Sequence, residues 1–95
     1  MTAYVIADIE VKDPVVYDDY RRQVLATIEQ FGGRFLVRGG KHEVLEGQPS
    51  VHRTIVLEFP SMEAVKRWYA SPEYAPLIVL RQKAASGYLF AVEGA

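Results

Sequence analysis

The chain has 95 residues, a formal net charge of −1, and a composition that is 49% hydrophobic and 24% charged, as expected for one globular domain over residues 1–95. The balanced and interspersed charge gives no electrostatic footprint for nucleic acid or an anionic membrane, and the lack of cysteine excludes disulfides and thiolate chemistry. Because residues 1–8 lack a basic segment and no apolar run approaches the roughly 18 residues that span a bilayer, we expect a cytoplasmic protein.

The N-terminal third predicts a strand followed by a helix. Residues 4–11 alternate between apolar and mixed positions, and a period of two is typical of a strand. Asp13 can accept from the first free N–H groups of a helix, and Pro14 loses no hydrogen bond at the first helical position. Apolar side chains then recur every three or four residues as far as Phe31, where a glycine pair is expected to end the helix.

Two more strands are predicted around a long hairpin. Residues 34–38 have the length of a strand, and alternation puts Phe35 and Val37 on one face and Arg38 on the other. The third strand is expected at about residues 52–59, because apolar and polar side chains alternate there as well.

The C-terminal part predicts a helix with one break and a final strand. Ser61 is expected to cap the helix, and the Ser-Pro step at 71–72 interrupts it. A second helical segment then covers residues 73–85, and the last strand is expected at residues 88–92.

This order of elements is the split βαβ pattern of a ferredoxin-like α+β fold. Right-handed crossovers then give an antiparallel sheet in the order 4-1-3-2, with both helices on one face. The other face keeps apolar side chains that a monomer would expose, so a second copy is expected to cover it and form a homodimeric α/β barrel. These side chains are Tyr4, Ile6, Leu36, Val56, Tyr88 and Phe90.

Four separate motifs also point to a known family. They lie at residues 32–40, 45–47, 58–61 and 68–74, and together they cover most of the chain. In these motifs the chain resembles the bacterial domain-of-unknown-function family thirteen-thirty. The resemblance implies a ferredoxin-like fold in the dimeric α/β-barrel superfamily and no established activity. The superfamily includes small monooxygenases and isomerases, which is an analogy of fold alone.

Polar side chains on the face without helices form the first candidate site. The directions of the strands put Asp8, His52 and Arg38 near one end of that face. Such a set can bind a small carboxylate or position a proton transfer, and we expect Arg38 to anchor any site through its planar guanidinium. The alternative is a network of structural ion pairs at the rim of the dimer interface.

The remaining candidates are one histidine and two aromatic residues. His42 follows two glycines in the hairpin and is either a general base or an exposed loop residue. Trp68 and Tyr74 flank the helix break and either line a pocket between helices and sheet or belong to the core. No metal site is expected, because two histidines without a third ligand lack the pattern of one.

These observations predict a homodimer that binds a small acidic or aromatic molecule, without a cofactor and with neither nucleic acid nor membrane as a partner. One alternative is a small cofactor-independent enzyme, of monooxygenase or isomerase type. The other alternative is a structural dimer that binds no ligand.

Overall fold

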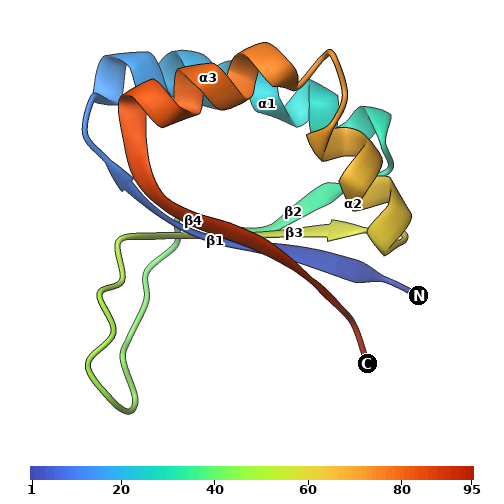
Figure 1. Cartoon of the computed structure of the whole chain (residues 1–95). Coiled ribbons are helices and arrows are strands. Elements are labelled where there is room, and N and C mark those ends of the chain that lie inside the picture. Colours follow the sequence, from blue (N-terminus) through green and yellow to red (C-terminus); the bar gives the residue numbers. More distant parts are fainter.

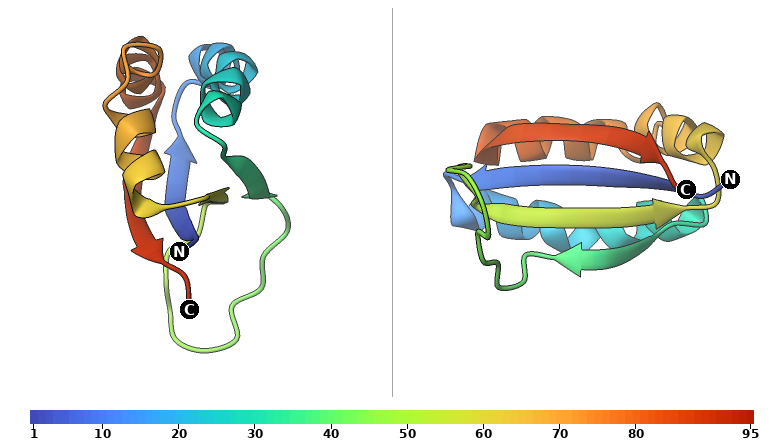
Figure 2. Two further views of the ribbon diagram at one scale, coloured as in Figure 1. Left: turned by 90° about the vertical axis from the view of Figure 1, so that its right-hand side faces the viewer. Right: turned by 90° about the horizontal axis from the view of Figure 1, so that it is seen from below.

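The computed structural model describes all 95 residues and has the expected ferredoxin-like architecture. A four-stranded antiparallel sheet has the order β2-β3-β1-β4, which is the predicted order read from the opposite edge. All the helices lie over one face of this sheet, as Figures 1 and 2 show. The elements are β1 (Ala3–Val11), α1 (Pro14–Gln30), β2 (Arg34–Arg38), β3 (Arg53–Phe59), α2 (Met62–Tyr69), α3 (Ala75–Ala84) and β4 (Ala85–Glu93).

The ends of α1 form as the sequence predicts. The Asp13 carboxylate accepts from the backbone N–H groups of Val15 and Val16, both at 3.2 Å. At the other end Gly32 adopts a φ of 81°, a left-handed conformation that glycine reaches without strain. Gly33 serves a different purpose, since a Cβ there would lie 2.7 Å from the ring of Phe59. The glycine pair therefore both ends the helix and lets it approach β3 closely.

The last strand is longer than expected. It begins at Ala85, directly after α3, and pairs with β1 along its whole length. Its first residues are Ala, Ser and Gly, which have little strand propensity, so the local sequence predicted a start only at Tyr88. Gly87 has a φ of 147° and lies against the carbonyl of Asp8, where only glycine fits. The pairing with β1 therefore decides where β4 begins.

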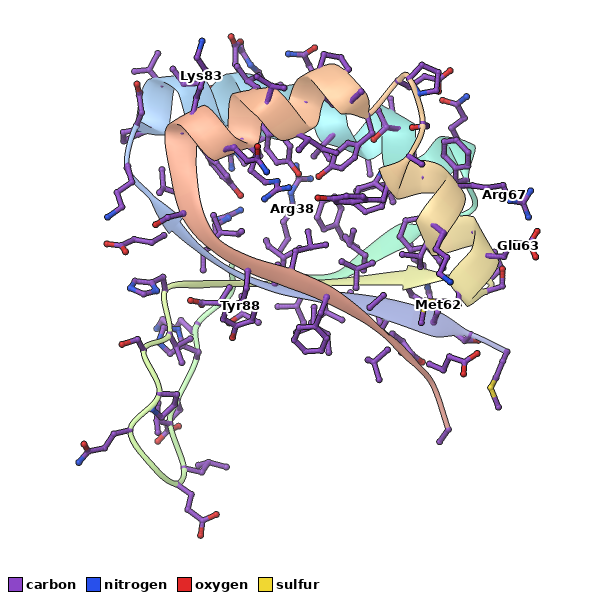
Figure 3. The ribbon with its side chains drawn as sticks, in the orientation of Figure 1. Arg38, Met62, Glu63, Arg67, Lys83 and Tyr88 are labelled. Atoms are coloured by element: carbon purple, nitrogen blue, oxygen red, sulfur yellow. The ribbon has the colours of Figure 1, made fainter.

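A β-bulge in β2 overturns one prediction about side-chain direction. Phe35 pairs with Leu57, but Val37 pairs with the next residue along β3, Val56, so β2 holds one extra residue. A bulge reverses the alternation for the residues that follow it. Val37 therefore lies on the face without helices, and Arg38 faces the helices. The expected placement of both side chains was wrong, and Figure 3 shows Arg38 in the layer between sheet and helices.

The face of the sheet that no helix covers is called the helix-free face below (Figure 2). It is largely apolar and carries side chains that a single chain leaves partly or largely exposed. The loop over residues 39–52, which contains no regular element, extends from the sheet away from the helices (Figure 1). The apolar residues of the helix-free face are Tyr4, Ile6, Val37, Val56, Tyr88, Phe90 and Val92.

The core lies between the sheet and the helices and contains 16 buried apolar residues. Its largest fully buried side chains are those of Trp68, Tyr74 and Phe59. Trp68 stacks on Tyr74 with ring centroids 4.2 Å apart, and Phe59 packs against Trp68 at a tilt with ring centroids 5.3 Å apart. No helix is both long enough and apolar enough to cross a membrane.

Candidate functional site

A cavity remains within the core, between the sheet and helices α1 and α3. Twelve of its sixteen lining residues are hydrophobic, and the sheet side consists of inward-facing residues of all four strands, most of them from β1 and β3. Protein atoms leave about 460 Å³ free, including the mouth, and the centre of a water molecule can move through about 30 Å³ of it. A single water needs roughly 10–15 Å³ by this measure, so the closed cavity has room for only a few waters.

The four lining residues that are not hydrophobic are all arginines, and each comes from a different element. Arg21 belongs to α1, Arg38 to β2, Arg53 to β3 and Arg81 to α3. No aspartate, glutamate or histidine lines the cavity. The fold therefore brings four positive charges to one apolar space without placing a negative charge in its wall.

Arg38 is held in position by neutral groups. Its Nη2 donates to the backbone carbonyl of Arg21 at 2.9 Å, and its guanidinium lies 4.2 Å from the centroid of the Phe35 ring. Both contacts orient the guanidinium plane, but neither neutralises its charge. The group therefore remains free to bind an anion at the cavity.

Arg53 and Arg81 lie deeper than Arg38. In each of these side chains the Nε atom is buried and has no hydrogen-bond partner. The Arg53 guanidinium lies 5.8 Å from the centroid of the Tyr17 ring. A buried donor without an acceptor costs roughly 1–3 kcal/mol, and more when the group is charged. These two orphaned donors are therefore groups that a bound acceptor would satisfy.

The tyrosines beside Arg81 supply no negative charge. Tyr20 and Tyr74 share a buried hydrogen bond, with their hydroxyl oxygens 2.8 Å apart. Burial raises the pKa of both Tyr20 and Tyr74 above the usual value for a phenol. Both hydroxyl groups are therefore neutral at physiological pH, and the Arg81 charge beside them stays uncompensated.

The arginines outside the cavity present the opposite picture, because each of them has an acidic partner. Arg34 pairs with Glu58 at 2.8 Å, and Arg67 pairs with Glu63 at 2.9 Å. Arg22 pairs with two aspartates of α1, and one of the cavity arginines, Arg21, pairs with Asp18 at 2.8 Å. Arg38, Arg53 and Arg81 alone among the arginines have no carboxylate within ion-pairing distance.

The predicted pair of Asp8 and His52 forms on the helix-free face, where it was expected. The His52 backbone N–H donates to Asp8 Oδ1 at 2.8 Å, and its ring Nδ1 lies 2.9 Å from Oδ2. These hydrogen bonds, the ring contact first, lower the pKa of Asp8 below the usual value for a carboxyl group. Arg38 was expected beside this pair and is instead on the opposite face, so the predicted three-residue site does not assemble.

Two of the predicted residues do meet at the cavity, namely Arg38 and Trp68. The Trp68 indole N–H donates to Thr27 Oγ1 at 3.1 Å, which orients the ring. Tyr74 is fully buried and stacks on Trp68, but it does not line the cavity. His42 is exposed in the loop and lies away from the cavity.

Sequence reasoning did not select Arg53, although a signal for it exists. Arg53 lies two residues before Ile55 and four before Leu57, so alternation in β3 places it on the face that packs against the helices. A charged residue in that pattern is unusual and indicates either a buried partner or a ligand site. Arg81 lies beside Tyr74, and the helical pattern alone does not direct its side chain into a cavity. No group of three or more His, Asp or Glu side chains could hold a metal ion.

The chain is thus a ferredoxin-like α+β protein with a small, arginine-lined apolar cavity between helices and sheet. Residues 2–95 match the family described as Domain of unknown function (DUF1330), and the chain belongs to this family. This finding confirms the family that the sequence motifs resemble. A comparison with curated proteins found no match.

Solved structures from several bacteria share the fold. A protein of unknown function from Rhodopseudomonas palustris has a TM-score of 0.80 at 18% identity, over 99% of this chain and 82% of that one. A dimeric ferredoxin-like protein of unknown function from Jannaschia sp. has a TM-score of 0.67 at 11% identity, over 99% and 100%. SnoaB, a cofactor-independent oxygenase from Streptomyces nogalater, has a TM-score of 0.67 at 13% identity, over 99% and 93%.

Proposed function

We propose that this protein is a homodimer in which each chain binds a small organic anion in the cavity between α1, α3 and the sheet. The observation that carries the proposal is the set of three guanidiniums, Arg38, Arg53 and Arg81, that face the cavity without a carboxylate partner. Two of them also have a buried Nε with no acceptor. A bound anion supplies both the missing charge and the missing acceptors.

Guanidinium charges without a negative partner in an apolar cavity raise the free energy of the folded protein. The three guanidiniums line one apolar cavity, where like charges repel one another and are screened less than in water. A carboxylate bound among the arginines replaces repulsion with attraction and offers the planar geometry that matches a guanidinium fork. The hydrophobic remainder of the wall favours an anion with an apolar body over an inorganic ion.

The alternative function is that of a cofactor-independent enzyme. It is supported only by the shared fold of SnoaB, which is a cofactor-independent oxygenase. The cavity wall offers charge and orientation but no imidazole or carboxylate that could remove a proton at neutral pH. The Asp8–His52 pair contains an imidazole and a carboxylate, yet it lies on the other face of the sheet. The lining therefore supports binding more strongly than acid–base catalysis.

The proposal is tested by isothermal titration of the protein with benzoate and with benzamide, its neutral analogue of nearly equal size. We expect benzoate to bind and benzamide to bind at least tenfold more weakly. Arg53→Met, which keeps a long apolar stem, is expected to reduce benzoate binding at least tenfold. Arg67→Met removes an exposed arginine of α2 and serves as the matched control with unchanged affinity. Equal binding of benzoate and benzamide, or no benzoate binding at all, would contradict an anion site.

A further inference from the structure

We infer that the ligand of this cavity is an amphiphilic dianion, with two adjacent negative charges on one end and a single flat apolar body that points toward Trp68. This inference rests on the proposed anion site and specifies the chemical class that the site takes. It follows from four properties of the cavity: where its charges lie, how many of them are unpaired, where the cavity opens and how large it is.

Two of the three unpaired arginines, Arg38 and Arg53, lie at one end of the cavity. Arg53 pairs across the ladder with Ile9, near the C-terminal end of β1, and Arg38 pairs with Ile55, which is the partner of Ala7. Arg81 is one turn before the end of α3, and that end lies beside the end of β1, since the Lys12 N–H donates to the Ala84 carbonyl at 2.8 Å. The guanidiniums of Arg38 and Arg53 therefore converge on the region below the first turns of α1, whereas that of Arg81 lies beside Tyr74, whose ring stacks on Trp68.

The opposite end of the cavity is apolar and aromatic. Trp68 packs on Phe59, which pairs with Ala3 at the beginning of β1. Its indole N–H donates to Thr27, in the last turns of α1. Trp68 therefore lies at the end of the cavity opposite Arg38 and Arg53, near the beginning of β1 and the end of α1. A ligand that fills the cavity needs a charged end and an uncharged end.

The cavity opens at its charged end. A shallow hollow on the surface, lined by Arg21, Arg22, Leu25 and Arg38, shares two of its arginines with the cavity. A second hollow beside it shares Tyr17, Arg21 and Arg53 with the cavity. A ligand that enters there inserts its apolar body first and leaves its charges among the arginines. Arg21 and Arg38 are exposed, so their side chains can move apart to admit it.

The number of unpaired charges favours two negative groups over one. A single carboxylate has two oxygens and is matched by one guanidinium in the bidentate arrangement. Three guanidiniums lack partners at this site, so one carboxylate leaves most of their charge uncompensated. Two adjacent carboxylates, or one doubly ionised phosphonate, offer enough acceptor oxygens for the exposed Arg38 and for the orphaned donors of Arg53 and Arg81.

The volume limits the apolar body to about one ring. The free space is about 460 Å³ with the mouth included, and only about 30 Å³ of it accepts the centre of a water molecule in the closed state. Even one ring exceeds this space, since a cavity that holds benzene measures about 150 Å³, so the ring can enter only if the exposed side chains of Arg21 and Arg38 move aside.

Three benzene carboxylates test the inference by titration calorimetry at one pH above 7 and one ionic strength. Phthalate carries two charges on adjacent carbons, terephthalate carries the same two charges on opposite ends, and benzoate carries one. We expect phthalate to bind at least tenfold more tightly than either of the others. Because Trp68 is the sole tryptophan, phthalate is also expected to change the intrinsic fluorescence with the same dissociation constant.

Two variants measure how much the second negative charge of phthalate contributes to binding. Arg81→Met should reduce phthalate affinity to the level of benzoate, while benzoate affinity changes by less than threefold. Arg67→Met, outside the cavity, should preserve the full difference between the two ligands.

The outcomes distinguish this inference from the proposal on which it rests. If benzoate, terephthalate and phthalate bind equally well, the dianion is wrong but the anion site stands. If terephthalate equals phthalate and both exceed benzoate, the two-ended cavity is wrong. If none of the three binds by calorimetry or fluorescence, both the inference and the proposed function fail.

Discussion

Asp8 is the buried carboxylate of the helix-free face, and both of its oxygens accept hydrogen bonds from His52. Because the ionised carboxylate can only accept, the His52 Nδ1 carries the proton, and its Nε2 lies 3.7 Å from Glu10 Oε1. The pair joins the end of the loop over residues 39–52 to β1. Its role in the isolated chain is therefore to fix the point where the loop returns to the sheet.

The Asp8 contacts predict a pH dependence of stability. The folded pKa of Asp8 is below its unfolded value of about 4, so the contribution is fully present above that value and is lost as pH falls through the folded pKa. We expect the free energy of unfolding in urea to fall from pH 5 to pH 3 more steeply for the wild type than for Asp8→Asn. Asp19→Asn, an exposed acid of α1, is the control and should follow the wild type. Parallel curves for wild type and Asp8→Asn would contradict the argument.

At the scale of elements, pairing with neighbouring strands decides the geometry of β2 and the starting point of β4. The bulge in β2 turns Arg38 toward the cavity and adds Val37 to the helix-free face, so one extra residue changes both surfaces. The early start of β4 depends on a glycine, since the Cβ of any other residue at position 87 would lie 2.0 Å from the Asp8 carbonyl oxygen.

Two glycine substitutions test this dependence. Gly87→Ala should lower the free energy of unfolding by about 1–3 kcal/mol, which is typical of a strained backbone. The added Cβ would clash with backbone atoms that cannot move aside. Gly40→Ala is the matched control, since a Cβ there meets no atom within 4 Å. Urea or thermal unfolding measures both. A Gly87→Ala variant as stable as Gly40→Ala would show that β4 does not pair with β1 in this register.

The whole molecule has only two layers. Its extents are 35 × 33 × 16 Å, and the short dimension corresponds to one sheet with one layer of helices. Tyr88 and Phe90 of β4 point away from the helices, are 58% and 48% exposed, and stack with ring centroids 6.2 Å apart. A second copy placed sheet to sheet would bury these rings, which supports the proposed homodimer.

The dimer is tested by size-exclusion chromatography with light scattering. Phe90→Asp places a charge on the helix-free face and should yield a monomer or an aggregate, because the charge would be buried without a partner. Val79→Asp is the matched control: it makes the same kind of change at an exposed apolar position of α3, and the dimer should persist. A monomeric wild type, or a Phe90→Asp variant that stays dimeric, would refute the arrangement.

The sequence by itself determined the order of the elements, the caps of α1, the N-terminal cap of α2 and the order of the strands in the sheet. These features depend on local chemistry, such as the Asp13 carboxylate at the start of α1, the glycine pair at its end and the alternation along β1. The nearness of Asp8 and His52 also followed from strand direction and register alone.

Only the tertiary structure decided which residues line the cavity. Alternation places Arg38 on the wrong face, because the bulge arises from pairing with β3 and leaves no mark in β2 itself. Arg53 and Arg81 are far apart in the sequence, and each alone looks like an ordinary arginine. Their shared lack of a carboxylate partner becomes visible only when sheet and helices enclose them, since an unpaired charge is a property of its surroundings rather than of its residue.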